Sequence, residues 1–155
     1  MIPIRAEAIV AWRAWRLGTY VTSDRTTEPF LRSCVYAEYW PAGERFEASC
    51  PHHTLPAPTC GCGVHGVTTR EEAVRWAVWA GGALPNPIVL GRVNLWGKVL
   101  QFSRGYRAQY AYPYELEVPG DGDWAGLDVG EIAERLRRDY LVDVVAHPPL
   151  LGRAA

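Results

Sequence analysis

The sequence has little lysine, few cysteines and no long apolar run. Lys98 is the only lysine among 16 basic residues, so arginine carries nearly all of the positive charge. No apolar stretch approaches the roughly 20 residues that cross a bilayer. The segment from Met1 to Trp12 lacks the charged start and apolar stretch of a secretory signal. We therefore expect a cytoplasmic protein with no membrane partner.

A strong net charge is also missing. Sixteen basic and 17 acidic residues give a formal net charge of -1, which disfavours bulk attraction to nucleic acid or anionic membranes. The charge is uneven, at +4 over residues 1–110 and -5 over residues 111–155, which indicates either an ordinary surface or a basic face with a partner. A hydrophobic content of 48% excludes a disordered chain. At 155 residues, we expect one domain over 1–147 and a disordered tail over 148–155.

Several segments have the composition of β-strands. Residues 8–17 are rich in aromatic and β-branched side chains, and residues 34–40 have the same character. Polar residues at 23–29 predict a connection between them. Residues 88–102 form a long alternating strand in which Gly97 predicts a bend or bulge. A turn at 103–105 leads into a return strand at 106–112, so the two form a hairpin.

Two segments carry helix start signals. Thr68 and Thr69 stand three residues before Glu71 and Glu72, which predicts a helix over 70–80 with Ala73, Trp76 and Ala77 on one face. Asp128 predicts a second helix, over 129–140, followed by a short strand at 141–145.

These elements predict a β-rich α+β domain with the hairpin at its centre. We expect both helices to pack on one side of the sheet and Trp96 to lie in the core.

Residues 50–66 have no hydrophobic periodicity, and they crowd together Cys, His, Pro and Gly. Cys50, His53, Cys60 and Cys62 give the spacing Cys-x2-His-x6-Cys-x-Cys. Thiolate and imidazole are zinc ligands, and a structural site uses four of them in a tetrahedron. Glycine next to the Cys-x-Cys pair allows the tight backbone that points both sulfurs at one ion. The loop is therefore predicted to hold one structural zinc ion.

Other interpretations of this loop stay open. His52 or His65 could replace His53 as the fourth ligand, and the ion could be catalytic or absent. A disulfide is less favoured, because reducing cytoplasm makes clustered Cys and His a metal site more often than a bridge. An iron–sulfur cluster uses four thiolates, and the fourth cysteine, Cys34, lies sixteen residues from Cys50 and is predicted to be a small buried side chain.

Four motifs follow one another in the chain. They are Ala48-x-Cys50, His53-x2-Pro56-x3-Cys60-x-Cys62-Gly63, Gly91-Arg92-Val93-x-Leu95-Trp96-Gly97-x-Val99 and Gly105-Tyr106-Arg107-Ala108-x-Tyr110-Ala111-x-Pro113. In this order they resemble a family of small uncharacterised actinobacterial proteins, and the resemblance covers residues 10–115. The resemblance implies no reaction. Such relatives have an Ile-Tyr-Ala-like run after Cys-x-Cys-Gly, whereas this chain has Val64-His65-Gly66, which leaves room for a local role of His65.

The sequence lacks the spacings of common catalytic sites. It has no His-Glu-x2-His, Gly-x-Ser-x-Gly or Walker loop, and no zinc-deaminase signature. We therefore expect a non-enzymatic, zinc-stabilised binding or adaptor domain that acts through a protein interface, with a zinc-dependent enzyme the third choice.

Arginine alternates with aromatic residues in two segments. This combination serves nucleic-acid binding, through phosphate contact and base stacking, and also protein interfaces, where Tyr, Trp and Arg carry most of the binding energy. Nucleic-acid binding is therefore the second choice of function. The predicted partner-binding residues are Trp12, Arg13, Arg16, Arg104, Tyr106 and Arg107.

Overall fold

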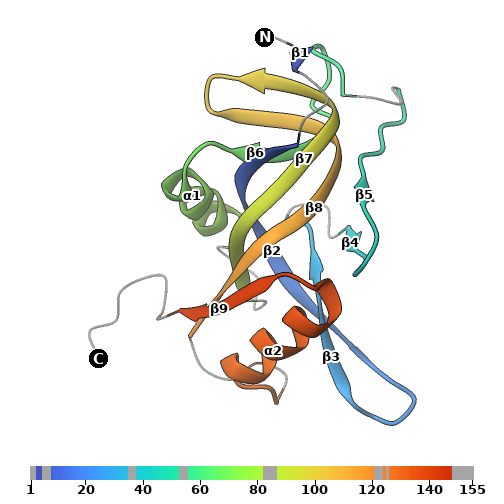
Figure 1. Ribbon diagram of the computed structural model, residues 1–155, viewed down its shortest axis with the longest axis vertical. Coiled ribbons are helices and arrows are strands. Elements are labelled where there is room, and N and C mark those ends of the chain that lie inside the picture. The colour runs from blue at the N-terminus through green and yellow to red at the C-terminus, as the bar shows by residue number, and fades with distance from the viewer. Residues whose placement is uncertain are drawn as a thin grey trace.

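The computed structural model describes residues 3–4, 8–34, 38–52, 56–81, 87–120, 124 and 126–147. Within these residues a single β-sheet carries two helices, which confirms the α+β class (Figure 1). The elements are, in chain order, β1 Pro3–Ile4, β2 Ile9–Val21, β3 Thr27–Arg32, β4 Tyr39–Trp40, β5 Phe46–Glu47, β6 Val64–Val67, α1 Arg70–Gly81, β7 Ile88–Phe102, β8 Gly105–Pro119, α2 Val129–Tyr140 and β9 Asp143–His147.

The predicted hairpin is the antiparallel pair β7 and β8, which is joined by a tight turn at residues 103–104. Gly97 has a φ of +76°, and the pairing register shifts between Trp96 and Val99, so the predicted bend is present. A side chain at Gly97 would place its Cβ 2.7 Å from the Tyr110 ring. The return strand is longer than predicted, because β8 continues to Pro119 and pairs with the parallel strand β9.

The sheet closes on itself around the hairpin. β7 pairs with β2 on one edge and with β8 on the other, while β6 pairs with β8 and meets β2 where Val67 faces Trp12. These four strands therefore form a small closed barrel. Gly66 on β6 faces its interior, where an added Cβ would lie 2.8 Å from the Ala11 Cβ and 3.0 Å from the Leu95 Cδ1.

Two boundaries differ from the sequence prediction. Residues 23–29 were expected to be a connection, but β3 already begins at Thr27, after a short turn in which the Thr22 hydroxyl accepts from Thr26 N at 3.1 Å. Of the strand expected over 34–40, the described part shows strand only at β4, and residues 35–37 lie outside the described residues. The predicted tail over 148–155 also lies outside them.

The helix α2 forms as its signals predict. Asp128 accepts a hydrogen bond from Glu131 N at 2.8 Å, and Leu141, with a φ of +56°, ends the helix by donating to Arg137 O. Ile132, Leu136 and Tyr140 are buried in the main core with Trp15 and Leu17 of β2. The Tyr140 hydroxyl donates to Trp40 O at 2.6 Å and accepts from Leu31 N at 2.9 Å, so it ties α2 to β3 and β4.

The expectation that both helices pack on one side of the sheet is wrong. Ala73 and Ala77 of α1 pack on Ala14 and Leu90 in a second, smaller core cluster. Successive side chains of a strand point to opposite faces, and Ala14 precedes Trp15, which faces α2. The helices therefore cover opposite faces, and α1 lies outside the barrel (Figure 1).

The placement of Trp96 in the core is also wrong. Trp96 is only half-buried and lies beside Tyr110, with ring centroids 6.0 Å apart. The large core aromatics are instead Trp15 and Trp40, which meet edge to face at 5.5 Å. Neither helix of the described residues has the length and apolar character that a bilayer crossing requires.

Candidate metal centre and adjoining cavity

Three cysteine thiols meet in the loop between β5 and β6. The sulfurs of Cys50, Cys60 and Cys62, which we call the thiol cluster, all lie within 4.8 Å of one another, and Cys50 Sγ is 3.5 Å from Cys60 Sγ. A tetrahedral zinc with Zn–S bonds of about 2.3 Å separates its sulfurs by about 3.8 Å. These three side chains could therefore hold a metal ion with little movement.

The loop that carries the thiol cluster is bent by local turns. Cys60 N donates to Ala57 O at 3.2 Å, and Gly63 has a φ of +110°. An added Cβ at Gly63 would lie 3.0 Å from Pro56 Cγ and 3.1 Å from Arg107 Cβ. Glycine is thus required at position 63 both by its backbone conformation and by the close approach of its neighbours.

Arg107 of β8 anchors this loop. Its Nη1 donates to the carbonyl oxygens of Cys60 and Cys62, the latter at 2.9 Å, and its guanidinium lies 4.6 Å from the Phe102 ring centroid. Only 7% of Arg107 is exposed. The sequence predicts that Arg107 contacts a partner, and in the structure its guanidinium contacts the backbone of the thiol cluster. No local signal in the sequence marks this role.

The neighbouring thiols change the acidity of Cys60. A backbone hydrogen bond with Cys62 lowers the pKa of Cys60, but hydrogen bonds with the thiols of Cys50 and Cys62 outweigh it and raise that pKa overall. Cys60 without a metal ion therefore favours the protonated thiol. Binding of a metal ion requires thiolates, and it would release this proton.

The fourth predicted ligand, His53, lies outside the described residues. Both proposed substitutes, His52 and His65, are described, but neither places a ring nitrogen within 4.8 Å of all three sulfurs. His65 stands instead on β6, where it lines a neighbouring cavity. Desolvation and the nearby charges of Arg13 and Arg107 lower the pKa of His65 to about 4, so it is neutral at pH 7.

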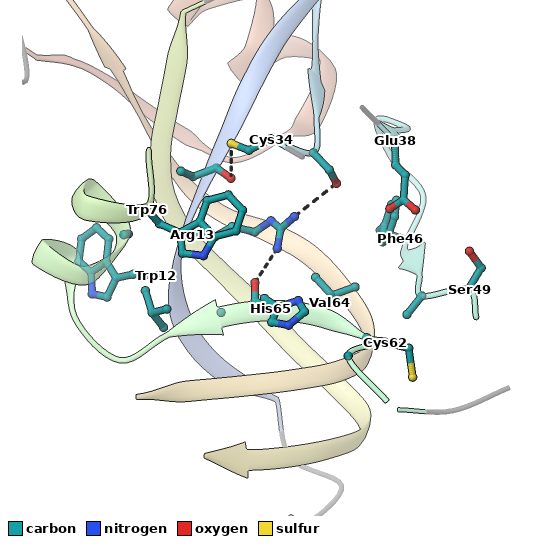
Figure 2. Close-up of a pocket in the computed structure, with 18 of the residues that line it drawn as sticks. Trp12, Arg13, Cys34, Glu38, Phe46, Ser49, Cys62, Val64, His65 and Trp76 are labelled. Carbon is teal, nitrogen blue, oxygen red and sulfur yellow. Dashed lines mark hydrogen bonds between the residues drawn. The ribbon is translucent and has the colours of Figure 1, made fainter. Parts of the chain in front are cut away.

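A cavity of about 430 Å³ adjoins the thiol cluster. We call it the aromatic cavity. Its walls come from β2, β6, α1 and the cysteine loop (Figure 2). The side chains that line it include Trp12, Arg13, Cys34, Glu38, Phe46, Cys62, His65, Trp76 and Trp79.

Arg13 projects into the aromatic cavity from β2. Its Nη1 donates to His65 O at 2.6 Å and its Nη2 to the Ser33 hydroxyl at 3.3 Å (Figure 2). The guanidinium lies 5.0 Å from the Trp40 ring centroid, in cation–π contact. Burial lowers the pKa of Arg13 to about 10, although the nearby Cys34 and Glu38 raise it. Arg13 therefore remains a cation at pH 7.

The helix α1 contributes two tryptophans to this site. Trp76 is predicted to share a helix face with Ala73 and Ala77, which are buried, but it is 39% exposed, and Trp79 is 74% exposed. Their rings meet edge to face with centroids 5.5 Å apart, and both line the aromatic cavity. Spacing along a helix predicts which residues share a face, but it does not show that the neighbouring strands leave this face open.

The other predicted partner-binding residues are scattered. Trp12 is half-buried and lines the aromatic cavity. Arg16, which the sequence predicts to bind a partner, has no exposed surface and donates to Cys34 O at 3.1 Å. Arg104 is exposed at the turn of the hairpin, while Tyr106 is half-buried against the main core.

No protein-family model, curated protein or solved structure matches this chain. The resemblance to small actinobacterial proteins therefore stays a prediction. The features of the chain that bear on its function are the thiol cluster, the aromatic cavity and the exposed tryptophans Trp76 and Trp79.

Proposed function

We propose that this chain is a non-enzymatic binding domain that is stabilised by one structural zinc ion and acts through a protein interface. The interface is the part of α1 that carries Trp76 and Trp79 together with the rim of the aromatic cavity. The observation that carries this proposal is the exposed pair Trp76 and Trp79. Exposed apolar groups next to a cavity are typical of interaction sites, and tryptophan is enriched among the residues that dominate binding energy.

The zinc ion would be held by Cys50, His53, Cys60 and Cys62. The spacing of the three sulfurs supports this set, as does the anchoring of two of their carbonyl groups by Arg107. With four protein ligands the ion has no open position for substrate, which fits a structural role. No disulfide joins any of the four cysteines, all of which lie within the described residues.

Because Cys62 lies on the wall of the aromatic cavity, the ion would also fix the shape of the proposed interface. Without the metal, the loop of residues 50–63 would lose the link that holds its sulfurs together. Metal binding and partner binding are thus expected to be coupled through the position of this loop.

Nucleic-acid binding is the second choice. Nucleic-acid binding would need exposed arginines that alternate with aromatic rings. Arg16 and Arg107, two of the four arginines proposed for this role, are buried. Arg104 is exposed, but it is the one exposed arginine among these four. Together with a formal net charge of -1, it offers little attraction to phosphates. We expect no measurable binding to random oligonucleotides at physiological salt.

The interface is tested by panning a random peptide library against the immobilised full-length chain. Enriched peptides should bind Trp79→Ala about thirty-fold more weakly, because truncation of a central tryptophan costs about 2 kcal/mol. Val78→Ala is the matched control: Val78 is 56% exposed on the same helix but does not line the aromatic cavity. Failure to enrich any peptide, or enriched peptides that bind Trp79→Ala and the parent equally, would overturn the proposal.

A further inference from the structure

We propose that the aromatic cavity is a binding site for a small organic monocarboxylate. The carboxylate would pair with Arg13, and the apolar body would lie against Trp12 and Trp76. This goes beyond the proposed protein interface, because it concerns a small molecule inside the cavity rather than a partner on the exposed helix face.

First, Arg13 has no directly paired carboxylate among the described residues, although the charge of the nearby Glu38 acts on it. Two half-buried arginines elsewhere in the chain meet carboxylates, Arg92 with Glu115 at 2.6 Å and Arg135 with Glu28 at 3.0 Å, whereas the buried Arg16 and Arg107 donate to backbone carbonyl groups. No carboxylate of the described residues comes within ion-pair distance of Arg13. A guanidinium removed from water without a counter-charge is costly, and an anionic ligand would supply that charge.

The second argument is that Arg13 retains unused donors. A guanidinium has five N–H groups, and within the described part of the chain Arg13 uses two nitrogens, toward His65 O and the Ser33 hydroxyl. Its Nε is buried and has no acceptor there. The buried Nε cannot be reached from the cavity, but the two existing hydrogen bonds and the Trp40 ring hold the plane of the group, so the remaining N–H groups of Nη1 and Nη2 are preorganised for a flat, two-oxygen acceptor.

Third, the charges that line the cavity fit a ligand with one negative charge better than a ligand with two. His65 is neutral at pH 7, and burial raises the pKa of the Cys34 thiol, so neither adds a charge beside Arg13. Glu38 also lines the cavity, on the side opposite Trp12 and Trp76 in Figure 2, and its carboxylate offsets part of the Arg13 charge, so a doubly charged ligand would be repelled more strongly than a singly charged one. A carboxylate therefore suits the cavity better than a phosphate does.

Fourth, the aromatic cavity offers space for an apolar group beside the Arg13 guanidinium. Trp12, Phe46 and Trp76 line the cavity, and its volume of about 430 Å³ lies within the usual range for small-ligand sites. Sites of this kind combine apolar walls with a few polar groups that orient the ligand. Arg13 is the orienting group here, and a planar ring system would fill the space between the aromatic walls.

The test uses two probes of nearly the same shape, 1-naphthylacetate and its neutral amide, titrated calorimetrically into the full-length chain at pH 7. We expect the acid to bind about ten-fold more tightly than the amide, a difference of about 1.4 kcal/mol. In Arg13→Gln this preference should disappear. In Trp76→Ala both probes should weaken together, and in Val78→Ala both should bind as in the parent.

A second measurement avoids any loss of folding in Arg13→Gln. In the unmutated chain, the NMR resonance of the Arg13 Nε–H should move when the acid is added and stay in place with the amide. Equal affinity for the two probes, absence of binding at millimolar concentration, or an Arg13 resonance unmoved by the acid would each overturn the proposal. The protein interface could survive such a result, since the peptides that test it depend on Trp79.

Discussion

Replacement of Arg107 by methionine probes how the fold holds the thiol cluster. Methionine retains an unbranched apolar chain at a position that is 7% exposed, but it removes the donor to Cys60 O and Cys62 O. A hydrogen bond with a charged partner contributes about 1.5–3 kcal/mol. Both bonds here come from one nitrogen, so we expect a combined loss of about 2–3 kcal/mol rather than twice the single value.

The loss should appear both in metal affinity and in stability. Removal of groups that orient metal ligands lowers affinity about 10- to 100-fold, so zinc should leave Arg107→Met more readily in competition with a chromophoric chelator. Urea unfolding of the zinc-loaded protein should shift in the same direction. Arg104→Met is the control, because Arg104 is exposed at the neighbouring turn. If the two variants hold zinc equally well, Arg107 does not position the thiol cluster.

Three further predictions concern the core, the barrel and pH. Trp15→Ala should cost about 3–5 kcal/mol in urea unfolding, whereas Trp96→Ala should cost distinctly less, and equal losses would contradict the assigned core. Gly66→Ala should destabilise the chain by about 1–3 kcal/mol, because its Cβ would lie 2.8 Å from that of Ala11; an unchanged midpoint would argue against barrel closure. The pKa of His65 falls from 6.5 to about 4 on folding, so the unfolded state binds more protons and stability should drop as the pH falls from 6.5 toward 4. His65→Gln should lose less stability over that range than the parent, and parallel pH profiles would contradict this.

Elements with local signals could be predicted from the sequence. The alternation of residues 88–102, the bend at Gly97 and the turn at 103–105 specify the hairpin, because strand faces and tight turns depend on neighbours in the chain. The same holds for α2, whose cap at Asp128 and buried Leu136 follow from helix spacing. The close placement of three cysteines is also a local property, since they lie within thirteen residues.

Features that depend on distant contacts could not be predicted. The barrel closes because Val67 of β6 meets Trp12 of β2, and that closure separates the faces covered by the two helices. The pairing of β6 with β8 brings Arg107 to the cysteine loop, where an arginine that resembled a surface contact in sequence becomes a buried anchor. Arg13 likewise acquires its cavity from β6, α1 and the loop before β6.

The proposed interface requires the cysteine loop to be held by its ion, so metal content is the most direct test. Elemental analysis of the full-length chain, purified without chelator, should find one zinc per chain, and Cys60→Ser should hold far less. Chelation should also lower the unfolding temperature of the parent, because metal binding contributes to folding free energy. Protein that is folded, metal-free and unaffected by chelator would contradict the account.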